Sequence, residues 1–293
     1  GSNRTTQNHS ITTMNKKALF DEVSVKCSRI TTTSYSTSFS LGIKTLSKEF
    51  RDPVYAIYGF VRFADEIVDT FHDHDKAYLL EKFRRDTVEA IEQKISLNPI
   101  LNAYQHVVNQ YNIEWELTDT FLKSMEMDLQ EIDYTREQYN QYILGSAEVV
   151  GLMCLRVFTR GNESEYQKLK PAAMKLGAAF QKINFLRDLN ADYLQLGRVY
   201  FPSIDMKYFD NDTKMIIEEE IAADFREAYI GITQLPKEAR YGVYLAYTYY
   251  LKLFHKIQGL DADTVLQERI RIPNPKKFTL MFGSFLKHNL NLL

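Results

Sequence analysis

Hydrophobic residues recur at intervals of three and four along most of the chain, with polar and charged residues between them. This period is typical of α-helices that bury one face. Only 12 glycines and 7 prolines occur in 293 residues, so signals for strands and tight turns are few. The pattern predicts an all-α protein. The expected helices cover residues 15–30, 51–71, 76–94, 99–110, 114–129, 136–154, 171–195, 213–232, 236–258 and 275–293.

Two of these helices carry pairs of acidic residues within otherwise apolar stretches. Asp65 and Asp69 lie four residues apart, and Asp188 and Asp192 repeat the spacing more than a hundred residues later. Residues four apart share one helix face, where like charges repel each other. Such pairs inside apolar helices call for a cation, and an all-oxygen ligand set suits Mg²⁺. The usual partner of such an ion is a diphosphate.

Residues suited to anion binding precede each pair on the same helix face. Tyr58 and Arg62 precede the first pair, and Gln181 and Asn184 precede the second, all at helical spacing. Arg62 also has a simpler interpretation as an intrahelical ion-pair partner of Glu66 or of the first motif aspartate, an interaction of a few tenths of a kcal/mol, about 0.3. The spacing leaves both interpretations open.

The two motifs, followed by the stretch 197–202 (Gly-Arg-Val-Tyr-Phe-Pro), resemble the squalene/phytoene synthase family of head-to-head prenyl transferases. The resemblance runs from about residue 35 to about residue 277. It implies a single-domain helical bundle of the isoprenoid synthase type, with a central hydrophobic cavity, over residues 14–293. The polar residues 1–13 are interpreted as an expression scar or disordered leader ahead of Met14.

The resemblance also implies roles for individual residues. The implied metal ligands are Asp65, Asp69, Asn184, Asp188 and Asp192. The implied catalytic residues are these four aspartates with Tyr142, Arg62 and Arg187. The implied diphosphate-binding residues are Ser36, Ser38, Tyr58, Arg62, Gln181, Asn184, Arg187, Arg198, Tyr250 and Arg269.

The hydroxyl-rich stretch 31–39 has two interpretations. Serine and threonine favour helix caps over helix interiors, so the pattern predicts a turn that caps the next helix. A helix N-terminus can also receive a phosphate, and the resemblance places Ser36 and Ser38 at the diphosphate site. Some relatives carry a basic residue where this chain has Thr37, which removes one phosphate contact.

Small residues gather in the helix around Tyr142, namely Gly145, Ser146, Ala147 and Gly151. Close helix packing and a hydrocarbon channel would each favour small side chains here. The resemblance favours the channel, with Tyr142 facing the reacting carbons. The sequence reads Ser-Ala-Glu at 146–148 where the family commonly has Val-Ala-Gly, and the direction of Glu148 stays open.

The resemblance implies a reaction in which two prenyl diphosphates join through a cyclopropylcarbinyl diphosphate. The preferred interpretation is a phytoene synthase of the bacterial type that acts on two C20 geranylgeranyl diphosphates for carotenoid biosynthesis. It needs Mg²⁺, with Mn²⁺ as a substitute, and NADPH is not expected. The first alternative is a squalene or dehydrosqualene synthase acting on C15 farnesyl diphosphate. The second alternative is a catalytically silent scaffold of the same fold. A silent relative would be expected to have lost some of the four motif aspartates, and all four are present here.

Composition and charge narrow the class further. The net charge of −2 gives no electrostatic case for nucleic acid. Cys27 and Cys154 show no metal-binding or disulfide spacing, which fits a reducing cytoplasm. No continuous apolar run reaches about 18 residues, so no membrane span is expected. The last predicted helix mixes basic and bulky apolar residues, and it either packs on the bundle or lies on the inner face of the membrane. Downstream carotenoid enzymes are the expected protein partners.

Overall fold

The computed structural model describes residues 4–130, 133–196, 201–202 and 209–270. These residues form helices, and none of them lies in a strand. The elements are α1 (Arg4–Tyr35), α2 (Thr37–Lys44), α3 (Lys48–Asp69), α4 (Lys76–Gln93), α5 (Pro99–Tyr111), α6 (Trp115–Met127), α7 (Arg136–Ile143), the π-helical turn η1 (Leu144–Glu148), α8 (Val149–Phe158), α9 (Glu163–Arg187), α10 (Leu189–Leu196), α11 (Asn211–Ile232), α12 (Lys237–Gln258) and α13 (Ala262–Gln267).

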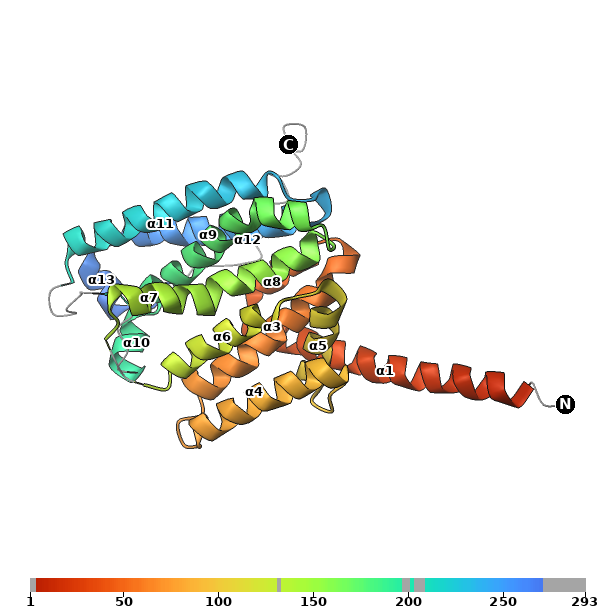
Figure 1. Cartoon of the computed structure of the whole chain (residues 1–293). Helices are drawn as coiled ribbons and strands as arrows, with labels where there is room; N and C mark the ends of the chain where they lie inside the picture. Colours follow the sequence, from red (N-terminus) through yellow and green to blue (C-terminus); the bar gives the residue numbers. More distant parts are fainter. Residues whose placement is uncertain (1–3, 131–132, 197–200, 203–208, 271–293) are drawn as a thin grey trace.

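The helices form two packed groups on either side of the continuous rod α7–η1–α8 (Figure 1). One hydrophobic core joins α3, α4, α5, α6 and α8. The other joins α7, α9, α11, α12 and α13. Because α8 and η1 pack on α9 as well as on α6, the rod holds the two groups together. The all-α prediction is confirmed.

Capping residues explain why several helix starts were predictable. Asp75, Asn98 and Asp210 each accept a hydrogen bond from a backbone N–H of the first turn of the helix that follows. Thr135 and Gln138 form a full capping box at the start of α7. Each cap satisfies N–H groups that the helix itself cannot, so the chain enters the helix at a defined residue.

The stretch 31–39 is more helical than predicted. α1 continues to residue 35, and within it the hydroxyls of Thr31, Thr32 and Thr33 each donate to the carbonyl four residues earlier, at 2.9 to 3.0 Å. These hydroxyls therefore bond within the helix and do not break it. Only Ser36 is extended, and its Oγ accepts a hydrogen bond from the Phe39 N–H at 3.1 Å, which caps α2. The capping prediction holds at this one residue.

The second aspartate motif is not on one continuous helix. α9 ends at Arg187, and Asp188 leaves helical geometry with φ −102° and ψ 9° before α10 begins. The Asp192 N–H still donates to the Asp188 carbonyl at 2.8 Å. The four-residue relationship therefore survives the break, although the predicted helix 171–195 does not. Gly197 and Arg198, and the predicted helix 275–293, lie outside the described residues.

Among the described residues, one helical segment has the length and mean hydropathy of a membrane span. It is the rod Arg136–Phe158, and 56% of its most apolar window is buried inside the bundle. A rod surrounded by other helices has the same composition as a membrane helix because both are apolar on most sides.

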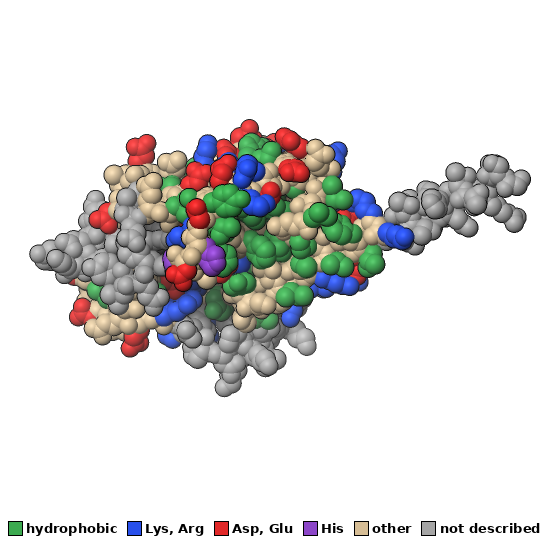
Figure 2. All heavy atoms as spheres, turned by 90° about the horizontal axis from the view of Figure 1, so that it is seen from below, with side chains coloured by type: hydrophobic (Ala, Val, Ile, Leu, Met, Phe, Trp, Pro, Cys, Tyr) green, Lys and Arg blue, Asp and Glu red, His purple; other side chains and the backbone are tan. Residues whose placement is uncertain are grey.

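Figure 2 shows acidic and basic side chains interspersed on the face seen from below.

Candidate active site

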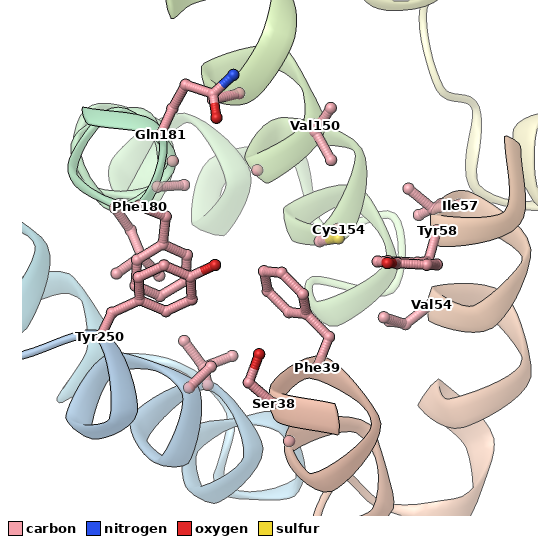
Figure 3. A pocket seen from close by; sticks show the side chains of 18 of the residues that line it. Ser38, Phe39, Val54, Ile57, Tyr58, Val150, Cys154, Phe180, Gln181 and Tyr250 are labelled. Carbon is pink, nitrogen blue, oxygen red and sulfur yellow. The ribbon is translucent and has the colours of Figure 1, made fainter. Parts of the chain in front are cut away.

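A cavity of about 460 Å³ lies between α2, α3, the rod and α9, and α11 and α12 complete its wall (Figure 3). On α3, the lining residues include the apolar Val54 and Val61, and the lining residue nearest the end of the helix is the charged Asp65. Along α9, Leu169 comes first and Arg187 last. Since both helices end with charged residues, the cavity has an apolar end and a polar end. Its polar lining is Ser36, Ser38, Tyr58, Arg62, Asp65, Ser146, Gln181, Asn184, Arg187, Tyr250 and Arg269.

Aromatic rings surround the middle of the cavity. The Phe180 and Tyr250 rings stack with centroids 4.1 Å apart, and Phe39 lies 6.0 Å from the Tyr250 ring and 6.0 Å from Tyr58 (Figure 3). At the apolar end, Phe158 packs edge-on against Phe50 with centroids 5.5 Å apart. Such walls exclude water, and aromatic faces attract cations.

The first aspartate pair lies at the polar end of α3. Asp65 lines the cavity, whereas Asp69, one turn further, does not. Burial raises the pKa of Asp65 well above its ordinary value, and the charge of Asp69 raises it further; Arg62 opposes both effects. A carboxylate held in this way is stabilised by any additional positive charge.

Asp128 is a carboxylate of this region that the sequence analysis left unassigned. It ends α6, is only 4% exposed, and raises the pKa of Asp65 by its charge. The Tyr142 hydroxyl donates to its Oδ2 at 2.6 Å. The acids of this segment do not share one helix face, so periodicity alone gave no signal for Asp128.

The structure supports both interpretations of Arg62 that the sequence leaves open. It forms an ion pair with Glu66 on the next turn, and its guanidinium lies over the Tyr35 ring at 4.6 Å from the centroid. The same side chain lines the cavity, and its Nε is buried with no hydrogen-bond partner among the described residues. A buried donor without a partner is costly, and an anion in the cavity would satisfy it.

The second aspartate motif is bound by arginines. Arg187 donates to both carboxylate oxygens of Asp188, at 3.0 and 2.7 Å, and the Arg269 Nε lies 3.2 Å from Asp188 Oδ1. Burial lowers the pKa of Arg187, but the hydrogen bonds to Asp188 and the electrostatic effects of Tyr250 and Asp188 together outweigh it and leave the pKa above its ordinary value. Both arginines line the cavity, whereas Asp188 and Asp192 do not.

Four hydrogen bonds join the polar linings of the rod, α9 and α12. The Tyr250 hydroxyl donates to Asn184 Oδ1 at 3.1 Å, and Asn184 Nδ2 donates to Gln181 Oε1 at 3.4 Å. Gln181 Nε2 donates to Ser146 Oγ at 3.0 Å, and Ser146 Oγ donates to the Tyr142 carbonyl at 2.6 Å. The predicted residues Gln181, Asn184 and Tyr250 are therefore one connected set.

The predicted serines lie at the start of α2 beside Tyr58. The Ser36 and Ser38 hydroxyl oxygens are 3.3 Å apart, and both residues line the cavity. Burial raises the pKa of Tyr58 to about 12, so it is a neutral hydroxyl at physiological pH. Ser36 is thus both the helix cap and part of the cavity wall.

Tyr142 and Gly145 do not line the cavity, contrary to the expectation that Tyr142 faces it and Gly145 leaves room beside it. A Cβ on Gly145 would lie 2.6 Å from Ser124 Cβ and 2.7 Å from the Thr120 carbonyl oxygen, so this glycine permits α6 to pack closely. Gly177 has the same role, with the Ala147 carbonyl 2.6 Å from its virtual Cβ. The packing explanation is the correct one for Gly145, whereas Ser146, Ala147 and Gly151 line the cavity, as the channel explanation expects.

Glu148 does not line the cavity either. Burial raises its pKa, and the positive charges of Lys182 and Lys175 oppose that effect. Lys182 is buried between α9 and α11, where its Nζ lies 2.6 Å from Asp224 and 2.7 Å from Glu220. Glu148 therefore lies within electrostatic reach of the ion pairs that Lys182 forms behind the cavity wall.

The residues at the polar end fit an oxygen-seeking divalent cation. Asp65 and the Asn184 oxygen offer hard donors, and the buried charge of Asp65 calls for neutralisation. Among the described residues, no group of three or more His, Cys, Asp or Glu side chains is placed to hold a metal by itself. Mg²⁺ commonly takes one or two carboxylates and completes its shell with water and substrate phosphates.

Comparison with known proteins gives the class of protein. Residues 32–276 match the family model of squalene/phytoene synthase, and the chain belongs to this family. It is 24% identical over 272 residues to phytoene synthase 3, chloroplastic, of Zea mays, covering 86% of this chain but 63% of the maize protein, less than two thirds of its length.

Two further similarities concern other members. The chain is 28% identical over 206 residues to the 4,4'-diapophytoene synthase of Staphylococcus haemolyticus, covering 68% of each protein. A crystal structure of a dehydrosqualene synthase in complex with ligand superposes with a TM-score of 0.77 at 21% identity, covering 93% of this chain and 98% of that one. The structural likeness establishes the isoprenoid synthase fold.

Proposed function

We propose that the protein joins two prenyl diphosphates head to head, through a cyclopropylcarbinyl diphosphate, and releases diphosphate. The observation that carries the proposal is the graded cavity, whose helices change from apolar to charged towards the same end. A prenyl diphosphate has the same gradient, since a hydrocarbon chain leads to a charged head. Burying that chain is favoured by about 25 cal/mol per Å² of apolar surface.

The polar end supplies groups suited to the departing diphosphate. Arg62, Arg187 and Arg269 place fixed positive charge there, where negative charge develops as the allylic C–O bond breaks. Asp65, Asp69 and Asp188, with Asn184, would hold the divalent cations, and Asp192 would join them from α10. The bound cations would neutralise the leaving diphosphate as Lewis acids.

The middle of the cavity protects the carbocation. Phe39, Phe180 and Tyr250 form a wall that excludes water and presents aromatic faces to positive charge. The Tyr250 hydroxyl donates to Asn184, so its proton is held away from the apolar end. Premature capture of the cation by water is thereby avoided.

The substrate proposed is geranylgeranyl diphosphate and the product phytoene, formed without NADPH. The similarity to phytoene synthases supports this choice. The second candidate is condensation of farnesyl diphosphate, which the similarity to the Staphylococcus 4,4'-diapophytoene synthase supports. The two differ only in chain length and in how the final cation is quenched.

The test is incubation of the purified protein with Mg²⁺ and either geranylgeranyl or farnesyl diphosphate, with and without NADPH, followed by mass analysis of the hydrocarbon extract. We expect a C40 hydrocarbon that NADPH does not change. A C30 product would move the assignment to the second candidate. The absence of product from both substrates would refute the proposed reaction and favour the alternative that the protein is a catalytically silent scaffold of the same fold.

The surroundings of the protein follow from its product. A C40 hydrocarbon is insoluble in water, so we propose a cytoplasmic enzyme that associates peripherally with the inner membrane face and delivers product to carotenoid-modifying enzymes. Cys27 and Cys154 are free thiols, which fits a reducing compartment.

A further inference from the structure

The side chain of Ser146 hydrogen-bonds in two directions. A serine hydroxyl has one hydrogen and two acceptor lone pairs. Ser146 directs its hydrogen to the Tyr142 carbonyl at 2.6 Å, and a carbonyl can only accept. Towards α9, therefore, Ser146 presents only lone pairs, and its neighbour there must donate.

This constraint passes along α9 from one amide to the next. Gln181 must turn its Nε2 towards Ser146, at 3.0 Å, so its Oε1 faces Asn184. Asn184 must then offer its Nδ2 to Gln181, at 3.4 Å. The Asn184 Oδ1 is left on the side of the Tyr250 hydroxyl, which donates to it at 3.1 Å. All four hydrogen bonds run in one direction, and aligned bonds of this kind strengthen one another.

We propose that Ser146 is a positioning residue that orients the Asn184 amide so that its oxygen, and not its nitrogen, faces the cavity. Only the oxygen of an amide can bind a cation. The proposal rests on the proposed function, because that function gives Asn184 a cation to hold. Ser146 itself touches neither the cation nor the reacting carbons in this role.

The neighbouring part of the rod supports the same assignment. Ser146 and Glu148 lie in the π-helical turn η1, and such turns occur frequently at functional sites. Ser146 bonds to Gln181, while Glu148 lies electrostatically close to Lys182, the next residue of α9.

The test is a titration of the substrate-free protein with Mn²⁺ alone, in which the electron paramagnetic resonance signal reports the concentration of the free ion. The variants are Ser146→Ala, Ser146→Thr, Asn184→Ala and the double variant Ser146→Ala/Asn184→Ala. Ser24→Ala is the matched control. Ser24 Oγ donates to the Phe20 carbonyl and accepts from Asn102 Nδ2, both at 3.0 Å, so it loses the same two bonds away from the cavity.

Ser146→Ala frees Gln181 and Asn184 to turn, so we expect its Mn²⁺ dissociation constant to rise about threefold to tenfold, the effect of one hydrogen bond. Ser146→Thr keeps the hydroxyl and should restore wild-type binding, and Ser24→Ala should leave binding unchanged. In the Asn184→Ala background, Ser146→Ala should add nothing, because the group that it orients is gone.

Wild-type Mn²⁺ binding by Ser146→Ala would overturn the proposal, as would separate effects of Ser146→Ala and Asn184→Ala that multiply in the double variant. A wild-type protein that binds no Mn²⁺ would overturn it too. Turnover of prenyl diphosphates is measured separately. If the wild type turns over prenyl diphosphates but Ser146→Ala binds Mn²⁺ as the wild type does, this inference alone is refuted. If Mn²⁺ binding depends on Ser146 but the wild type shows no turnover, the proposed function alone is refuted.

Discussion

The carboxylate of Asp65 lies where burial and the charge of Asp69 both disfavour ionisation. Its pKa is raised in the folded protein, so the folded state binds a proton there more readily than the unfolded chain does. The contribution of this group to stability is therefore greatest at low pH, and it is lost as pH rises from the ordinary value of 3.8 through the raised pKa. The site keeps an unfavourable charge that a bound cation would relieve.

Asp65→Asn removes this charge and keeps the side-chain shape. We expect turnover to fall by more than about 100-fold, because loss of a direct ligand should exceed the effect of losing an outer-shell partner. Without divalent cations at neutral pH, we expect the variant to unfold at a higher urea concentration than the wild type. Enzyme assays and urea melts in a chelator test both statements, and full activity together with lower stability would contradict them.

The Arg62 guanidinium forms an ion pair with Glu66 and lies over the Tyr35 ring, and the same side chain lines the cavity. Lysine keeps the charge but not the planar fork of donors. We expect Arg62→Lys to lower kcat/KM about tenfold to 100-fold, the effect of one or two charge-assisted hydrogen bonds. Arg84→Lys, which replaces an arginine paired with Asp119 away from the cavity, is the matched control. Equal kinetics for the two variants would show that Arg62 is only an intrahelical partner.

At the scale of elements, α9 carries the cavity face and the ionic network behind it. Lys182 bonds to Asp224 and Glu220 of α11, and Asp224 is only 4% exposed. Removing one partner of a buried pair leaves an uncompensated charge. We expect Lys182→Met to lower the free energy of unfolding by about 3 kcal/mol. The pair of the exposed Lys123 with the partly buried Asp119 is the control, and Lys123→Met should change stability by less than about 1 kcal/mol, because Asp119 keeps its ion pair with Arg84.

Helix positions were predictable where a cap marks the start, as at Asp75, Asn98 and Thr135. The break at Asp188 was not, because its backbone carbonyl still receives the Asp192 N–H and the four-residue period continues across it. The extension of α1 through the threonines was missed for another reason. A hydroxyl can bond inside its own helix or cap the next one, and its sequence position does not say which.

At the scale of the molecule, the sequence identified most groups that line the polar end but not how they are arranged. Gln181, Asn184 and Tyr250 were predicted separately, and only the fold shows that they are linked. Among the small residues of the rod, Ser146, Ala147 and Gly151 line the cavity as expected, whereas Gly145 was misread, since it permits close packing and adds no empty space. Asp128 had no periodic signal, because its position depends on how α6 meets the first aspartate pair.

The apolar end of the cavity sets the length of hydrocarbon that fits. Phe158 lines this end and packs against Phe50. We expect Phe158→Ala to raise kcat/KM for a longer prenyl diphosphate relative to the wild-type substrate by about tenfold, as the space of a few methylenes would. Because the truncation costs about 3 to 5 kcal/mol of stability, Phe158→Leu serves as the milder variant. An unchanged preference in two folded variants would place the end of the cavity elsewhere.

The central claim is that two substrate molecules each lose diphosphate in one active site. The most direct test measures inorganic diphosphate and hydrocarbon from the same reaction with Mg²⁺. We expect two diphosphates for each hydrocarbon, whose carbon number is twice that of the substrate. A doubled-carbon product that keeps one diphosphate would mean that the reaction stops at the cyclopropylcarbinyl diphosphate, whereas an alcohol or diphosphate with the carbon number of the substrate as the only product would contradict head-to-head joining.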